Sequence, residues 1–445
     1  PLLHGIYIGK VEPVLTSVCF ACVSFGSSSP CVSTQAKIDD PKTPRPDDVE
    51  FDNEAYTNPK YVGTVWYIAD HLRDPTKPII PLAALPPARR QLDADFFDSI
   101  SDALGFGNIR PRDRIRHGHR NLSTCSLTSV VAANWSGAYK FAKDIAEQVG
   151  DEVKNGWVEL PMPVPSTWPF RLEQQNGISQ GLKDDGTPKV RRATDKGDGP
   201  DSVNQCIELV SKLKLCTNLQ IGRGAAILAT ADDGPRATPN DNENPNDPST
   251  VADDTRTYLW KIDLTAAYRQ VTIHLLCLWM CHTSWDGEVY LDRRMQFGDK
   301  SAVEGFQSIT NLLLCAAQAA IDGDVAMRAL VPHAAHLWQY IDIRPTNEAY
   351  QRWELDRLNA FGEGPQLRLT HTDGYIDDFM GAVHGRRRAY AVAAVHRSFI
   401  GKGGANFPLK ASKECLPMPT MVALGGSLDI DSGLATLSSE RAERY

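Results

Sequence analysis

Two short stretches decide how the chain is interpreted, GYIDDFMGA (residues 374–382) and KIDLTAAYRQ (residues 261–270). Each stretch places carboxylates next to apolar residues that favour β-strands: Asp377 and Asp378 in the first stretch and Asp263 in the second. Adjacent carboxylates are costly to bury unless something neutralises them. The other five Asp-Asp pairs lie in polar segments, where solvation explains them. A plain strand-end position would also explain Asp263 when it is taken alone.

If the two strand ends meet, three carboxylates come to one place. Hard oxygen ligands of this kind suit Mg²⁺ or Mn²⁺ better than zinc. Asp263, Asp377 and Asp378 could then hold a pair of such ions. We therefore expect a two-ion site at this point.

Outward from these stretches, the pattern predicts alternating helices and strands. Helices are expected at about 135–157, 301–321 and 387–400. The second of these would begin with a capping box at Ser301. Strands are expected at 171–180, 188–195, 258–264, twice within 366–385 around a tight turn, and as a pair within 420–437.

Bulk properties exclude little. The net charge of −8 argues mildly against a nucleic-acid binder, but two acidic stretches, 38–54 and 231–256, account for it. Ten cysteines without a regular framework indicate a reducing, intracellular compartment. No apolar run is long enough to span a membrane. The abrupt ends at Pro1 and Tyr445 suggest a fragment of a longer polyprotein.

The motifs resemble those of reverse transcriptases. KIDLTAAYRQ is similar to the first palm motif of that family, RMQFGDKSAVEGFQ (294–307) to the second, and GYIDDFMGA to the Tyr-x-Asp-Asp hairpin, in the family's order. Weaker matches are GTPKVRRATDKG (186–197), PDSVNQCI (200–207), LKASKEC (409–415) and VALGGSLD (422–429). The residues of these motifs resemble those of retrotransposons more than those of retroviruses, and we expect a DIRS-like element.

The resemblance implies roles for individual residues. Asp263 and Asp377 would bridge two metal ions, with Asp378 as an outer ligand. Tyr268 would form the floor of the sugar pocket and exclude a 2′-hydroxyl. The other implied contacts are Arg191, Lys183 and Lys413 with phosphate, Phe297 and Gly298 with the base, and Tyr375, Ile376 and Gly425 with template or primer. Core packing of Tyr268, a solvated hairpin for Arg191 and Lys183, and Lys410 in place of Lys413 remain open.

The fold implied is α+β, a right-hand polymerase with fingers and palm, in which an antiparallel sheet packs on helices and the thumb is only begun. The predicted divisions are an extension at 1–60, a helical region at 61–135, fingers at 136–256 with the acidic loop 231–256, a palm at 257–437 with an insertion at 331–366, and a thumb start at 438–445.

The expected activity is Mg²⁺-dependent DNA synthesis from dNTPs on a primed RNA or DNA template. The oligomeric state stays open. An RNA-dependent RNA polymerase is an alternative, although those enzymes usually place an acid where this chain has Tyr268. An inactive nucleic-acid-binding relic is another. The second motif lacks a Pro after Ala302, and 114 residues separate Asp263 from Asp377, which is long for the family.

Overall fold

The structure is a computed structural model that describes residues 6–7 and 92–437, apart from 106–109, 122, 124, 126–129, 160–169, 183–185, 200, 208–214, 239–241, 245–246 and 362–367. The predictions for residues 1–60 (except 6–7), for Lys183 and for 438–445 lie outside these residues, as does most of 61–135. The α+β class is confirmed: helices pack on three sheets. Fingers, palm and thumb stay predictions.

One sheet, called the β5 sheet below, contains Asp263 and Asp378 in its strands, and Asp377 lies in the turn immediately before Asp378. Its strands run in the order β10-β5-β9-β8 and pair antiparallel. Their bounds are Cys415–Met418, Thr257–Asp263, Asp378–His384 and Thr370–Tyr375. The strand and hairpin predictions for 258–264 and 366–385 are thereby confirmed.

Side chains alternate across the β5 sheet, and each face has its own core. Trp260 and Ile262 pack in the large core with the helices α10 (Lys300–Ile321) and α14 (Arg386–Ile400). Leu259 and Met380 point the other way, into a smaller core with α8 (Asn218–Ala229). By this alternation Lys261, Asp263 and Asp378 belong to the α8 face.

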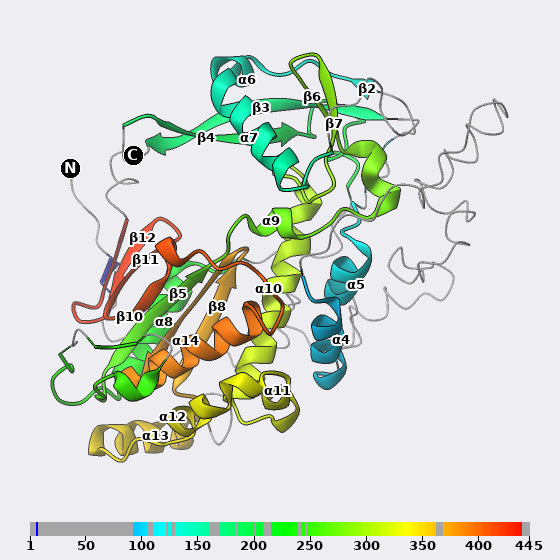
Figure 1. The fold of residues 1–445 in the computed structure, drawn as a ribbon. Coiled ribbons are helices and arrows are strands. Elements are labelled where there is room, and N and C mark those ends of the chain that lie inside the picture. Colours follow the sequence, from blue (N-terminus) through cyan, green and yellow to red (C-terminus); the bar gives the residue numbers. More distant parts are fainter. Residues whose placement is uncertain are drawn as a thin grey trace.

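Helix α10 is the longest element and connects the parts of the molecule. Figure 1 shows it running from the β5 sheet, which α14 covers, toward the strands β3 and β4 at the opposite end. The predicted helix is confirmed, but the predicted cap is wrong: Asp299 caps α10 and accepts a hydrogen bond from Ser301 N. The Ser301 hydroxyl instead donates to the Asp299 carboxylate at 2.6 Å.

A second sheet, the β3 sheet, lies at that opposite end (Figure 1). Strand β3 (Arg171–Leu182) pairs antiparallel with β4 (Pro188–Asp195), as the sequence pattern predicted. The helix predicted at 135–157 is two helices, α6 (Ser136–Lys140) and α7 (Ala142–Lys154), because Phe141 leaves helical geometry at φ −113° and ψ 37°. The remaining strands are β2 (Val130–Val131), β6 (His282–Trp285) and β7 (Glu288–Leu291).

The third sheet contains the hairpin of β11 (Thr420–Ala423) and β12 (Gly426–Asp429), followed by β13 (Leu434–Leu437) and β1 (Ile6–Tyr7). The predicted insertion contains a 3₁₀ turn and two helices, separated by the non-helical residues 342–347, which a mixed composition did not indicate. Other helices are α4 (Ala94–Ala103), α5 (Arg110–His117), α9 (Ala267–Gln270), α11 (Val325–Leu330), α12 (Trp338–Ile341) and α13 (Glu348–Phe361). Short 3₁₀ turns occupy Pro248–Thr250, Leu275–Met280, Pro332–Leu337 and Ala411–Lys413.

The search for membrane-spanning helices found none long and apolar enough among the residues that the structure describes.

Candidate active site

The three aspartates meet at one end of the β5 sheet. Asp263 ends β5 and Asp378 begins β9, and the two are direct cross-strand partners. Such partners on one face have Cβ atoms only about 5 Å apart. Asp377 occupies the turn immediately before Asp378. The strand ends that are far apart in the sequence therefore lie side by side.

Two lysines lie against these carboxylates. The Lys261 ammonium is 2.9 Å from Asp378 Oδ1 and 4.0 Å from Asp263 Oδ2. The Lys413 ammonium donates to Asp263 Oδ2 at 3.2 Å. Between the two lysines that the LKASKEC motif offers, the structure places the Lys413 side chain at the site, while the Lys410 backbone N–H donates to Asp263 O.

The pKa values of the acids in the turn are shifted upward. Burial and the nearby Asp263 carboxylate raise the pKa of Asp377. Burial raises the pKa of Asp378 to about 6, although Lys261 opposes the shift. Both shifts mean that negative charge at this point is incompletely compensated by the protein, so a further cation would stabilise the ionised carboxylates.

The donor set has the chemistry that a hard divalent cation requires, which is carboxylate oxygen. In the described part of the chain, however, no group of three or more His, Cys, Asp or Glu side chains is arranged to hold a metal ion. The ammonium groups of Lys261 and Lys413 contact carboxylate oxygens that such a cation would use. The carboxylates are thus the kind of ligand that such a cation binds, but the side chains of Lys261 and Lys413 would have to move off these oxygens before it could bind.

The turn before Asp378 has a strained backbone. Ile376 has φ 55°, which is unusual for a β-branched residue and matches the first central position of a type II′ hairpin turn. Helix α10 holds this turn: Gln307 Oε1 accepts from Ile376 N at 2.8 Å, and Gln307 Nε2 donates to Gly374 O at 3.1 Å. Thr310 Oγ1 donates to Ile376 O. The strain is therefore offset by hydrogen bonds from a rigid element.

Beside the aspartates, three side chains form a stack. The Phe297 ring lies edge-to-face with Tyr268, with centroids 5.0 Å apart, and the exposed Arg191 guanidinium lies 4.5 Å from the centroid of the Phe297 ring. Tyr268 is buried against Phe306 as well. Burial and then the Asp377 charge raise the pKa of the Tyr268 hydroxyl, which stays neutral at physiological pH. The core packing of Tyr268 is thus observed, and it leaves the ring next to the aspartates.

Gly298 is needed for its backbone. It has φ 102°, and a Cβ there would overlap Thr194 O on β4. Thr194 N donates to Phe297 O at 3.0 Å, so the turn at 297–298 lies against β4. Asn204 holds the same turn by donating to Gly298 O and accepting from Lys300 N.

Of the other predicted residues, Tyr375 lies beside the site, Gly425 lies in a turn of another sheet and Lys183 is outside the described residues. Tyr375 pairs with Asp378 and packs partly buried against the α8 core. Gly425, with φ 72°, and Leu424, with φ 51°, form the tip of the separate β11–β12 hairpin, as a type I′ turn requires. Nothing is described of Lys183.

Sequence reasoning assigned no role to Lys261, Gln307 or Thr310. A signal for Gln307 existed: it directly follows Phe306 of the predicted apolar stripe, so burial was to be expected, and a buried amide needs partners. Lys261 lies two residues before Asp263 on the same strand, and therefore on the same face of the sheet. Its proximity to Asp263 could have been predicted from the period of two.

No protein-family model and no curated protein sequence matches the chain. Among solved structures, the chain is similar to the native prototype foamy virus protease-reverse transcriptase, with 15% identity, coverage of 70% of this chain and 29% of that one, and a TM-score of 0.37. It is also similar to the foamy viral enzyme in complex with double-stranded DNA (13%, 81% and 59%, 0.41) and with an RNA/DNA hybrid (12%, 79% and 37%, 0.38). The chain spans 29% to 59% of the length of these proteins.

Proposed function

We propose that this chain catalyses template-directed DNA synthesis, adding dNTPs to a primer 3′-hydroxyl. One observation supports the proposal above the others: Asp263 and Asp378 face each other across β5 and β9, with Asp377 in the adjoining turn. Carboxylates on rigid strands, near an exposed guanidinium and a pair of aromatic rings, provide the parts that nucleotidyl transfer needs.

Each residue has a distinct task in this proposal. Asp263 and Asp377 would hold a pair of Mg²⁺ or Mn²⁺ ions, and Asp378 would support them. When bound, these ions would neutralise charge on the reacting phosphate and orient the primer hydroxyl. Gln307 and Thr310 keep the turn with Asp377 in place. Lys413, once turned from Asp263, lies where it can contact the triphosphate or supply a proton.

The stack of Arg191, Phe297 and Tyr268 would hold the nucleotide. Arg191 is exposed, and its planar guanidinium suits phosphate oxygens. Phe297 and Gly298 would lie against the base, and the Tyr268 ring would close the sugar pocket below. The bulk of the ring in that position would exclude a 2′-hydroxyl, which favours deoxynucleotides over ribonucleotides.

The test is Mg²⁺-dependent primer extension on RNA and DNA templates by the chain and by Asp377→Asn. We expect a fall in rate of at least about a hundredfold, the scale of losing a group that stabilises transition-state charge. Asp373→Asn is the matched control, because Asp373 is also a mostly buried carboxylate with a raised pKa on β8 but is not one of the three carboxylates assigned to the site. It should retain most of the rate.

Three outcomes would count against the proposal. Unchanged incorporation by Asp377→Asn would end the assignment of the acids. Extension with ribonucleotides in preference to dNTPs would indicate an RNA polymerase. Binding of primer-template without any incorporation, in Mg²⁺ or Mn²⁺, would indicate an inactive relic.

A further inference from the structure

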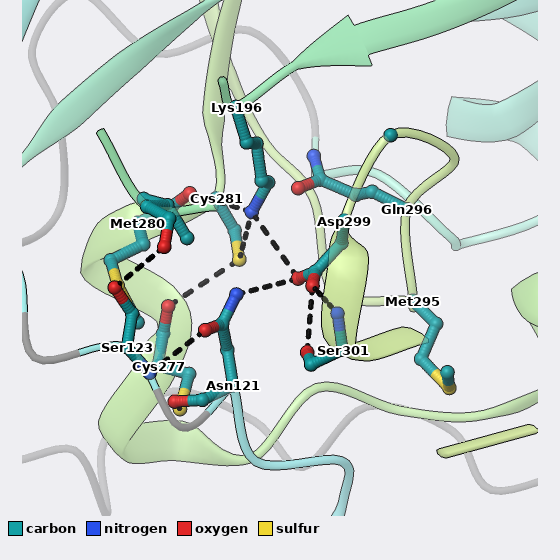
Figure 2. Close-up of polar contacts among 12 residues, drawn as sticks. Asn121, Ser123, Lys196, Cys277, Met280, Cys281, Met295, Gln296, Asp299 and Ser301 are labelled. Carbon is teal, nitrogen blue, oxygen red and sulfur yellow. Dashed lines mark hydrogen bonds and ion pairs between the residues drawn. The ribbon is translucent and has the colours of Figure 1, made fainter. Parts of the chain in front are cut away.

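Lys196 is a fully buried cation directly after β4. Its ammonium donates to Met280 O at 3.0 Å and lies 3.8 Å from Asp299 Oδ2. Figure 2 shows these residues together. Cys281 Sγ is also 3.8 Å away. A buried ammonium is retained in a fold only when charge and hydrogen bonds compensate its desolvation.

Asp299 supplies that charge. Asp299 is buried, and its carboxylate accepts hydrogen bonds from Asn121 Nδ2 at 2.6 Å and from Ser301 N and Oγ. These contacts, which Figure 2 draws, fix the position of the carboxylate. Burial raises the pKa of the Cys281 thiol to about 12, so this group is neutral at pH 7. Burial alone would raise the pKa of Asp299, but Lys196 and other neighbours hold it below its ordinary value. Both partners are therefore ionised.

The pair connects the two segments that form the proposed nucleotide pocket. Lys196 follows Thr194 by two residues, and Asp299 follows Phe297 by two. Thr194 and Phe297 are themselves joined by the 3.0 Å backbone hydrogen bond. Arg191 is on the same strand, β4, as Thr194. The ion pair and the backbone bond thus form two successive links between β4 and the turn at 297–299.

We propose that Lys196 and Asp299 are positioning residues that set how closely the Arg191 guanidinium approaches the Phe297 ring, and thereby the affinity for the incoming dNTP. The inference rests on the proposed function, because it names the nucleotide as the ligand of this pocket. Removing one partner leaves an uncompensated buried charge, which displaces the turn from β4. Removing both leaves neither charge of this pair uncompensated.

The kinetic test compares Lys196→Met, Asp299→Asn and the double variant. Asn keeps the oxygen that caps α10, so the charge at 299 is lost together with the oxygen that accepts from Asn121. Each single change should raise the dNTP KM about tenfold or more while kcat changes much less, and the double variant should recover most of the KM, as expected for a coupled pair.

The matched control is the buried Arg386–Glu243 pair, whose two hydrogen bonds measure 2.6 Å. Arg386 follows the end of β9 that is remote from Asp378. Glu243→Gln should reduce stability without raising the dNTP KM. Equal KM effects in this control, or effects at 196 and 299 that simply multiply in the double variant, would overturn the proposal.

A second measurement does not depend on polymerase activity. Amide hydrogen exchange of residues 194–197 and 296–300 should accelerate in Lys196→Met and not in Glu243→Gln. Unchanged exchange there would refute the positioning role. If the wild-type chain is inactive but hydrogen exchange in the two variants differs as stated, the proposed function is refuted and the link between β4 and the turn is still established.

Discussion

Replacing Gln307 by leucine isolates the contact between α10 and the β8–β9 turn. The change keeps side-chain size and apolar packing on the helix but removes the hydrogen bonds to Ile376 N and Gly374 O, together with one to the Asn311 side chain on the same helix. Two lost hydrogen bonds, with their backbone partners left buried and unsatisfied, cost roughly 2–4 kcal/mol. In the wild-type chain, part of that energy holds Ile376 at its positive φ. We expect the turn that contains Asp377 to shift once these hydrogen bonds are lost.

The consequence for catalysis follows from this energy. Each 1.4 kcal/mol corresponds to a factor of about ten in rate. If the hydrogen bonds serve to hold the turn, primer extension by Gln307→Leu should fall at least about tenfold in kcat. The assay is single-nucleotide extension at saturating dNTP, with urea unfolding measured on the same preparation.

Gln318→Leu is the control on the same helix. Gln318 is also a buried glutamine facing β8, but its amide bonds the side chains of Thr370 and Thr372 instead of the turn backbone. Both variants should lose a similar amount of stability, and only Gln307→Leu should lose the rate. Equal rates for the two variants at equal folded fraction would refute the reasoning.

Three further predictions concern the pocket and the core. Tyr268→Ala should admit ribonucleotides in primer extension, and unaltered sugar selection would remove Tyr268 from the pocket. Gly298→Ala should raise the dNTP KM and lower the unfolding midpoint, because its Cβ would overlap Thr194 O and its φ is 102°; wild-type values in both assays would contradict this. Burial lowers the pKa of His396 to about 4, so the unfolded chain takes up a proton between pH 6.5 and 4 that the folded chain does not. Stability from this group is complete above pH 6.5 and falls by roughly 3 kcal/mol toward pH 4. Relative to His396→Gln, the wild type should therefore lose urea resistance over that range, and parallel pH profiles would disprove it.

Much of the local structure could be predicted from the sequence. The period of two in 258–264 and around 374–382 predicted strands, and the helical period predicted α10 and α14, because burial of one face leaves a repeating apolar pattern. The break at Phe141 and the cap at Asp299 were not predicted. Both depend on contacts that local periodicity does not report.

What the sequence by itself determined is the kind of groups available: three carboxylates at strand ends, an exposed arginine, two aromatic residues and a glycine at a turn. Only the tertiary structure decided their partners. Lys261 and Lys413 lie on the carboxylates, Gln307 holds the Ile376 turn, and Lys196 meets Asp299. The physical reason is that an apolar period records whether a side chain is buried, whereas the identity of its neighbour depends on how segments 69 to 150 residues apart pack together.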